Sequence, residues 1–210
     1  LPKYMKKEGR EAVVDFRGGS YATYDESVSA GLKKGAFDVY ASQSWQDTDG
    51  HRPHSAATQN NLYANAGYRL NKEWDARFLI NYVNSRTQAP MPDRVPTATN
   101  GVSWPGAERY DTETLFATFT LNHTYESFGG YIKAYRNDTT FDLLQELNSG
   151  VRYAGGSDGV HSRQEIGLYG VRARETFRIW RGSEAGLGVD LDMTDLKNTQ
   201  STYTGRAITG

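Results

Sequence analysis

Cysteine is absent from this chain of 210 residues, which excludes disulfide bonds and every form of thiolate chemistry. An excess of one charge is also absent, because 24 basic residues balance 25 acidic residues and leave a net charge of −1. A protein without a basic field has nothing to attract the phosphates of a nucleic acid, so we expect no nucleic-acid partner.

Long hydrophobic runs are missing too. The mean hydropathy is −0.70, and no segment approaches the roughly 18 consecutive apolar residues that a membrane helix requires. The first ten residues, LPKYMKKEGR, are basic but have no apolar core, so they do not predict a signal peptide. What the chain does contain is 14 Tyr, 8 Phe, 4 Trp and 22 Gly, a composition that favours β structure.

Residues 74–83, WDARFLINYV, show how the apolar residues are arranged. On a helix they would spread around the whole circumference. On a strand, Trp74 and Phe78 share one face, whereas Asp75 and Arg77 share the other. The same alternation with a period of two predicts further strands, which makes nine in all, over residues 12–17, 27–33, 37–45, 62–70, 74–83, 114–121, 128–137, 169–179 and 185–194. The facing of 128–137 stays open, because Lys133 and Arg136 fall on opposite sides. Trp180 falls on the polar side of its strand, so we expect a bulge or a change of register there.

The connections between these strands alternate in length. Short turns are predicted at 33–35, 71–73, 125–127 and 181–184, and long polar segments at 46–59, 86–109 and 138–164. An up-and-down meander with all its short turns at one end produces this alternation, and outer-membrane barrels have this form. We therefore predict an all-β, antiparallel, up-and-down transmembrane β-barrel. A soluble β-sandwich has no reason to sort its loops by length.

Aromatic spacing favours the same fold. Phe37 and Trp45 lie eight positions apart on one face, and Trp74 and Tyr82 repeat that spacing. Eight residues of a tilted strand rise roughly 20 Å, close to the apolar band of about 25 Å that aromatic girdles flank in membrane barrels. We predict that these four residues form the girdles.

Charged residues gather on the opposite face of the strands, where they would line a wet lumen. The predicted lumen-facing residues are Asp38, Arg69, Asp75, Arg77, Arg172, Arg174, Arg178, Asp190 and Asp192. The three arginines at 172, 174 and 178 form a basic stripe that would make salt bridges or steer anions. Glu175 breaks the pattern, because it lies between Ala173 and Phe177 on the apolar side.

The sequence also resembles a known family. Gly19-Ser20-Tyr21, the Asp49-Gly50-His51-Arg52 loop, and the strand from Asn61 to Gly67-Tyr68 that leads into Trp74 resemble the early barrel of TonB-dependent outer-membrane receptors. Residues 176–193 resemble a later hairpin of the same barrels, and the resemblance extends over about residues 11–196.

The resemblance implies a receptor of the bacterial outer membrane that binds and imports a scarce ligand, most simply a ferric siderophore or another metal chelate. Members of the family have an N-terminal plug domain, through which they meet TonB, and a 22-stranded barrel. About nine strands are predicted here. We therefore expect residues 1–10 to be a lead-in from a plug outside this sequence and residues 11–210 to be barrel strands. The remaining strands, or a partner chain, would close the sheet within the outer-membrane lipid.

The long segments hold the candidate ligand-binding residues. These are His51, Arg52, His54, Arg94, Trp104 and Arg109. Aromatic and arginine side chains above a pore would suit an anionic chelate, although a plain surface loop explains them as well. Two histidines without a third ligand do not predict a metal site, and we expect no cofactor.

Catalytic motifs are not found. There is no G-x-S-x-G and no H-E-x-x-H, so we do not expect an enzyme. Two other functions stay open: a passive porin-like or scaffolding outer-membrane barrel, and a soluble β-rich binding or adhesion module.

Overall fold

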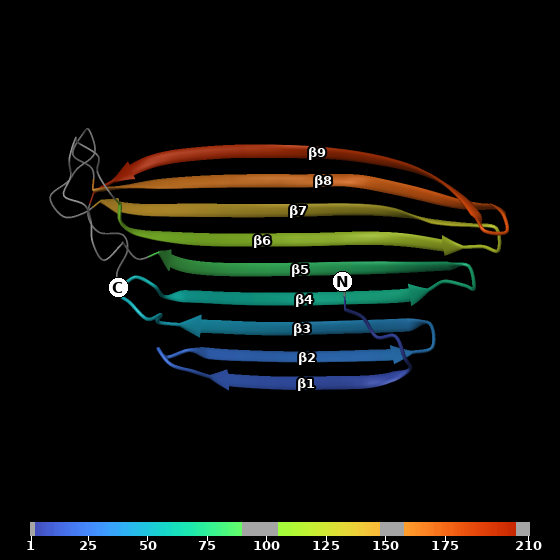
Figure 1. The fold of residues 1–210 in the computed structure, drawn as a ribbon, viewed down its shortest axis with the longest axis horizontal. Helices are drawn as coiled ribbons and strands as arrows, with labels where there is room; N and C mark the ends of the chain where they lie inside the picture. The colour runs from blue at the N-terminus through green and yellow to red at the C-terminus, as the bar shows by residue number, and fades with distance from the viewer. Residues whose placement is uncertain (1–2, 90–104, 148–157, 205–210) are drawn as a thin grey trace.

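The computed structural model describes residues 3–89, 105–147 and 158–204, and these form one antiparallel sheet of nine strands in chain order (Figure 1). The strands are β1 (Gly9–Gly18), β2 (Tyr24–Lys34), β3 (Phe37–Thr48), β4 (Ala57–Arg69), β5 (Trp74–Ala89), β6 (Pro105–Thr124), β7 (Phe128–Leu147), β8 (Gly159–Trp180) and β9 (Ser183–Tyr203). The prediction of an all-β, up-and-down arrangement is confirmed. Across the described ranges no helix is long and apolar enough to cross a membrane.

The connections are sorted by length between the two ends of the sheet, as the alternation predicts. At the end that we call the turn end, the strands are joined by residues 35–36, 70–73, 125–127 and 181–182. At the opposite end, the loop end, they are joined by residues 19–23, 49–56, 90–104 and 148–158. In Figure 1 the turn end lies on the right and the loop end on the left.

The predicted limits of the long segments were wrong, because the strands extend further toward the loop end. Residues 86–89 and 105–109 belong to β5 and β6, and residues 138–147 and 159–164 belong to β7 and β8. These extensions are polar, yet they continue the antiparallel pairing, with Arg86 opposite Asp111 and Asp142 opposite Arg163, and the register shifts between Pro105 and Glu108 on β6. Opposite charges on facing positions stabilise such pairs, so polar sequence continues the sheet here instead of leaving it. At the other edge, β1 begins at Gly9 within the expected lead-in.

Two neighbouring rows of the sheet show how the faces differ. One row passes through all nine strands as Gly9, Lys33, Asp38, Gly67, Arg77, Thr120, Lys133, Arg172 and Asp190, and we call it the charged row. The neighbouring row lies one residue further along each strand, on the opposite face, and we call it the apolar row. It consists of Arg10, Leu32, Val39, Ala66, Phe78, Phe119, Ala134, Val171 and Leu191. The sheet therefore has a polar face and an apolar face.

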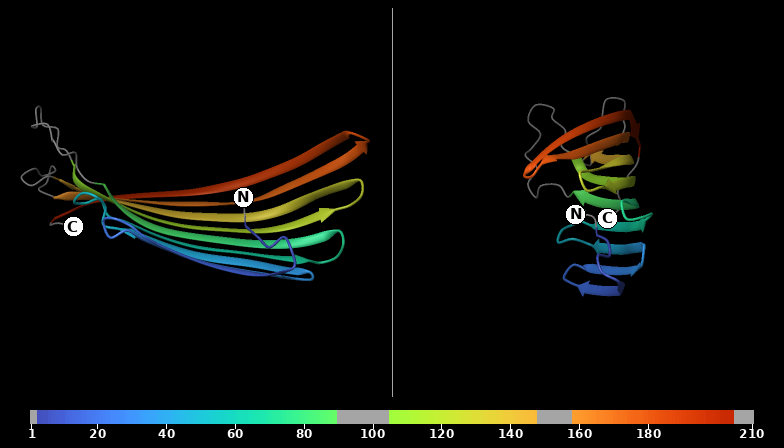
Figure 2. Two further views of the ribbon diagram at one scale, coloured as in Figure 1. Left: turned by 60° about the horizontal axis from the view of Figure 1, so that its bottom comes forward. Right: turned by 90° about the vertical axis from the view of Figure 1, so that its right-hand side faces the viewer.

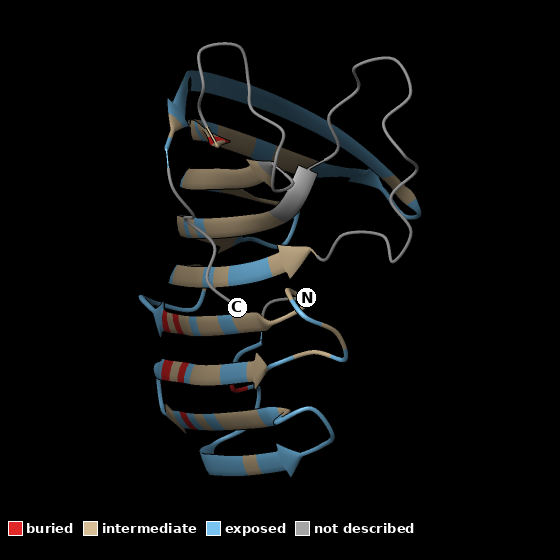
Figure 3. Ribbon diagram, turned by 90° about the vertical axis from the view of Figure 1, so that its left-hand side faces the viewer, coloured by how far each residue is buried: buried red, intermediate tan, exposed pale blue. Residues whose placement is uncertain are grey.

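The hydrophobic residues are not gathered into a core. In the described residues the buried apolar side chains are Met5 and Tyr40, whereas Phe78, Phe119 and Val171 are 46 %, 50 % and 44 % exposed. Figure 3 shows the buried positions mainly on β2, β3 and β4, with most of the sheet exposed or half-buried. The apolar face is thus bare of protein over almost its whole extent.

The two edge strands do not meet. Figure 2 shows a curved and twisted sheet with β1 at one side and β9 at the other, and neither edge has a second partner strand. Between Arg178 and Trp180 the pairing of β8 with β9 shifts, which confirms the irregularity predicted at Trp180.

Candidate functional site on the polar face

Arg77 lies at the centre of the most interconnected polar cluster on the polar face. Its guanidinium donates to both carboxylate oxygens of Asp38, at 3.1 and 3.0 Å, and to the side-chain oxygen of Asn65 at 2.9 Å. The ring of Tyr4 covers it, with 4.4 Å between the guanidinium carbon and the ring centroid. The cluster joins β3, β4, β5 and the N-terminal segment, and Asn65 is completely buried within it.

Gly67 makes this arrangement possible. It stands between Asp38 and Arg77 in the charged row, and a Cβ at this position would lie 2.4 Å from Arg77 Nη2 and 2.5 Å from Asp38 Oδ2. A side chain at this position would fit only if the two charged groups moved apart. Two strands that are not neighbours are therefore joined by an ion pair that passes over the glycine.

Residues 3–8, the N-terminal segment, cross β4, β3 and β2 on the polar face before the chain enters β1 (Figure 1). The Lys3 carbonyl accepts hydrogen bonds from the Tyr63 hydroxyl at 3.0 Å and from Asn65 Nδ2 at 3.2 Å. Met5 is 8 % exposed and fills the space above Gly31. A hydrogen bond and charge interaction with Tyr40 raise the pKa of the Lys3 ammonium above its ordinary value of 10.5.

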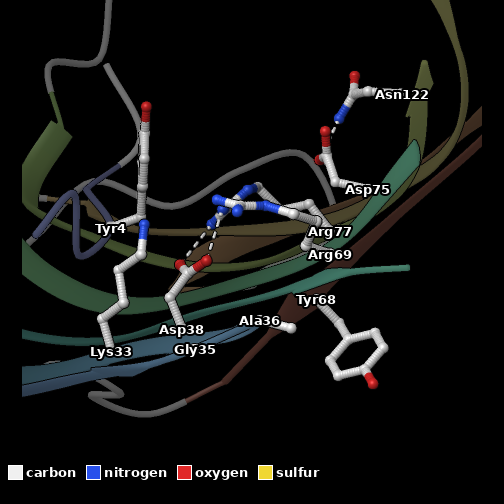
Figure 4. Close-up of a pocket in the computed structure, with 10 residues that line it drawn as sticks. All are labelled: Tyr4, Lys33, Gly35, Ala36, Asp38, Tyr68, Arg69, Asp75, Arg77 and Asn122. Carbon is white, nitrogen blue, oxygen red and sulfur yellow. Dashed lines mark hydrogen bonds and ion pairs between the residues drawn. The ribbon is translucent and has the colours of Figure 1, made fainter. Parts of the chain in front are cut away.

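A pocket of about 330 Å³ opens beside this cluster toward the turn end (Figure 4). Its walls carry the cations Lys33, Arg69 and Arg77 and the anions Asp38 and Asp75. Asp75 accepts a hydrogen bond from Asn122 at 2.9 Å, so its charge is also held by a neighbouring strand. The structure thus gathers four of the predicted lumen-facing residues in one place.

The remaining predicted lumen-facing residues lie on β8 and β9. Arg172 donates to Asp190 at 2.7 Å and lies over the Tyr135 ring at 5.9 Å. Arg174 faces Gly188 and Asp192 faces Gly170 across the strand pair. Arg178 donates to the Glu126 carbonyl at 3.1 Å, near the turn end. These arginines share the polar face with Arg77 but form a separate group, since β6 and β7 lie between them.

The connection between β3 and β4 carries His51, Arg52 and His54. His51 packs edge-on against Tyr21 at a centroid distance of 6.3 Å, and the backbone N–H of Arg52 donates to Ser55 Oγ at 3.1 Å. His54 has a left-handed φ of 59°, and its Nδ1 atom is buried with no hydrogen-bond partner in the described part of the chain. The three residues lie in the connection between β3 and β4 at the loop end.

The other candidate ligand residues do not join them. Arg94 and Trp104 lie outside the described residues. Arg109, expected in a loop, lies in β6 with its side chain on the same side as the apolar row, where it forms an ion pair with Asp111 at 3.1 Å. Its placement in a loop was wrong, because the strand continues past it.

The predicted girdle residues Phe37, Trp45, Trp74 and Tyr82 all lie on the apolar face. Beyond Tyr82 toward the loop end, this face changes character and carries a ladder of ion pairs. Arg163 lies 3.4 Å from Asp142 and 2.9 Å from Glu165, which in turn lies 3.2 Å from Lys197. The charges hold β7, β8 and β9 together in the long polar extensions.

Sequence reasoning missed the N-terminal segment as part of the site. Tyr4 and Met5 are the nearest apolar side chains in a lysine-rich lead-in, but no local pattern links them to strands about sixty residues away. The described residues hold no group of three or more His, Asp or Glu side chains that would bind a metal. No protein-family model matches the chain, and no curated protein matches it either.

Proposed function

We propose that the chain is part of the β-barrel of a TonB-dependent receptor in a bacterial outer membrane, which binds and imports a ferric siderophore or another metal chelate. One observation carries the membrane part of the proposal. The charged row and the apolar row run side by side through nine strands on opposite faces, and the apolar one is exposed. Lipid would cover the apolar face and water or a plug domain the polar face.

The energetics disfavour a soluble module. Leaving the large apolar side chains of nine strands in water would forgo about 1.5–3 kcal/mol for each one that a core could bury. With Met5 and Tyr40 as the buried apolar residues of the described chain, such a protein would have little to offset the entropy of folding. In a bilayer the same side chains are buried by lipid.

The open edges support a larger barrel. Because neighbouring strands alternate in direction, β1 and β9 both run from the turn end to the loop end. They cannot pair antiparallel with each other, and two copies of the sheet would meet in the same parallel fashion. An odd number of further strands closes the sheet with antiparallel pairs throughout, and the family's 22-stranded barrel would require thirteen beyond these nine.

The N-terminal segment supports a receptor rather than an empty pore. It lies on the polar face, so the preceding polypeptide would arrive from the inside of a barrel. The resemblance places a plug domain there, and TonB would act through it. The ligand specificity belongs to the loop end, where His51, Arg52 and His54 lie.

Uptake by intact cells tests the proposal. Cells that carry the complete receptor are offered a panel of ferric siderophores with radiolabelled iron, and we expect them to accumulate iron from at least one of them. That uptake should be lost when TonB is deleted or the proton gradient is collapsed. Uptake that persists without TonB would favour the passive pore. Protein that stays monomeric and β-folded in buffer without detergent would instead favour the soluble module.

A further inference from the structure

Glu175 is an acidic residue at the turn end of the apolar face, which also carries Arg136, paired with Asp138 at 2.6 Å. Glu175 lies between Ala173 and Phe177 on β8, in a row that runs Trp74, His123, Gly130, Glu175 and Leu187 across β5 to β9. A carboxylate at the edge of lipid is costly unless a partner compensates its charge. Within the described residues no Lys or Arg lies within ion-pair distance of it.

The surroundings of Glu175 are built rather than incidental. His123 Nε2 lies 3.0 Å from each carboxylate oxygen, reaching across β7 at Gly130. A Cβ at Gly130 would lie 2.1 Å from the Arg174 carbonyl oxygen and 2.7 Å from Glu175 Oε2, so the glycine makes room for the β8 backbone as well as for the carboxylate. Glu175 is nevertheless 29 % exposed, and a carboxylate has about four acceptor sites, so one imidazole N–H leaves most of its capacity open.

Aromatic rings surround the same point. The Trp74 ring lies 4.8 Å from the His123 ring at a tilt of 32°, and its indole N–H donates to the Tyr125 hydroxyl at 2.8 Å. Tyr125 and Phe128 are stacked at 4.6 Å, and Phe128 continues to Phe177 at 6.4 Å. Tyr125, Phe128 and Phe177 are each about two-fifths exposed. The cluster lies at the turn end of the apolar face, at the level of Trp74.

We propose that this turn-end cluster, Trp74, His123, Tyr125, Phe128 and Glu175, binds the primary ammonium headgroup of a phospholipid such as phosphatidylethanolamine. A carboxylate beside exposed aromatic faces is the chemistry that recognises a cation, because the ring quadrupoles and the negative oxygens attract it together. A primary ammonium also has three N–H donors for the open acceptor sites of Glu175, which a quaternary choline lacks. Phospholipid headgroups lie at the height of an aromatic girdle, so the site and its ligand would meet without further rearrangement.

The inference rests on the proposed membrane location, and the experiment separates the two. The complete protein is first reconstituted into vesicles and floated on a density gradient. Protein that does not float with the vesicles overturns both proposals. Protein that floats is then extracted in mild detergent with equal amounts of dioleoyl phosphatidylethanolamine, phosphatidylcholine and phosphatidylglycerol, and the retained lipids are counted by native mass spectrometry.

We expect phosphatidylethanolamine to be retained about tenfold over phosphatidylglycerol, since an ion pair and cation–π contacts act together. Glu175→Gln should remove that preference, and Phe128→Leu should weaken it while keeping an apolar side chain. Glu126→Gln, which removes a carboxylate at the same end but outside the cluster, should leave it unchanged. Equal retention of the three lipids by the wild-type protein overturns the lipid site and leaves the proposed membrane location intact. This comparison needs no variant. A preference that survives Glu175→Gln overturns it as well.

Discussion

Arg77 on β5 reaches over Gly67 of β4 and contacts both carboxylate oxygens of Asp38 on β3, at 3.1 and 3.0 Å. The ion pair spans three strands, and its partners are largely shielded, since the side chains of Arg77 and Asp38 are 24 % and 10 % exposed. A pair held in this way depends on the empty space above the glycine. Even a methyl group at Gly67 would therefore disturb the pair.

Replacement of Gly67 by alanine should separate this pair. The new Cβ would fall 2.4 Å from Arg77 Nη2, so the guanidinium must move and leave a shielded carboxylate without its partner. We expect a loss of about 1–3 kcal/mol in the free energy of unfolding, measured by urea titration in lipid vesicles. Gly188→Ala is the matched control, because a Cβ there meets its nearest neighbour at an ordinary 3.5 Å. Equal effects at the two glycines would show that the ion pair over Gly67 contributes nothing.

Phe78→Arg tests which face meets lipid. Phe78 is 46 % exposed in the apolar row, where a bilayer would surround it. An arginine near the middle of the bilayer costs about 2–4 kcal/mol, so we expect the variant not to assemble into lipid vesicles. Assembly is measured as the protection of the protein from added protease. The same substitution at Thr118, on the polar face of β6, should assemble normally. If both variants assembled equally well, the assignment of the two faces would be wrong.

Alternation alone is enough to predict the nine strands and their two faces, because each strand has one side in a different solvent from the other. It does not predict where the strands end. Asp142 and Arg163 look like loop residues in the sequence, and their cross-strand ion pair becomes visible only when the register is known. The Arg77 cluster is similar. The alternation predicts that Asp38 and Arg77 share a face, but it does not predict that their ion pair passes over Gly67. The contacts of Tyr4 and Met5 depend on tertiary structure and have no local signal.

Acid should weaken the ladder of ion pairs at the loop end, which lies beyond the apolar stretch 169–177 of β8. The hydrogen bonds from Arg163 and then Lys197 lower the pKa of Glu165 below its ordinary value of 4.5. A carboxyl whose pKa is depressed on folding stabilises the folded state above the unfolded value of 4.5 and loses that contribution as the pH falls through the folded value. Unfolding midpoints measured from pH 6 downward should therefore drop below about pH 4.5.

Glu165→Gln should flatten this drop, because the neutral amide has no proton to gain. Asp195→Asn, which removes a carboxylate from the same side of β9, should leave the slope as it is in the wild-type protein. A slope that is identical in all three proteins would mean that the Glu165 ion pairs are fully screened by solvent.

Asn65→Ala should release the N-terminal segment from the polar face. The buried amide donates to the Lys3 carbonyl at 3.2 Å and accepts from Arg77 at 2.9 Å, so its removal deletes two hydrogen bonds and leaves Tyr63 as the side-chain donor to the Lys3 carbonyl. We expect a cost of about 1–3 kcal/mol in the free energy of unfolding. Trypsin cleavage at Lys3, Lys6 and Lys7 should also become faster, because a detached segment enters the protease more readily. Asn81→Ala is the control, because Asn81 lies on the polar face of the neighbouring strand β5, and it should leave the cleavage rate unaltered. Slow cleavage in both variants would show that Met5 and Tyr4 hold the segment without the help of Asn65.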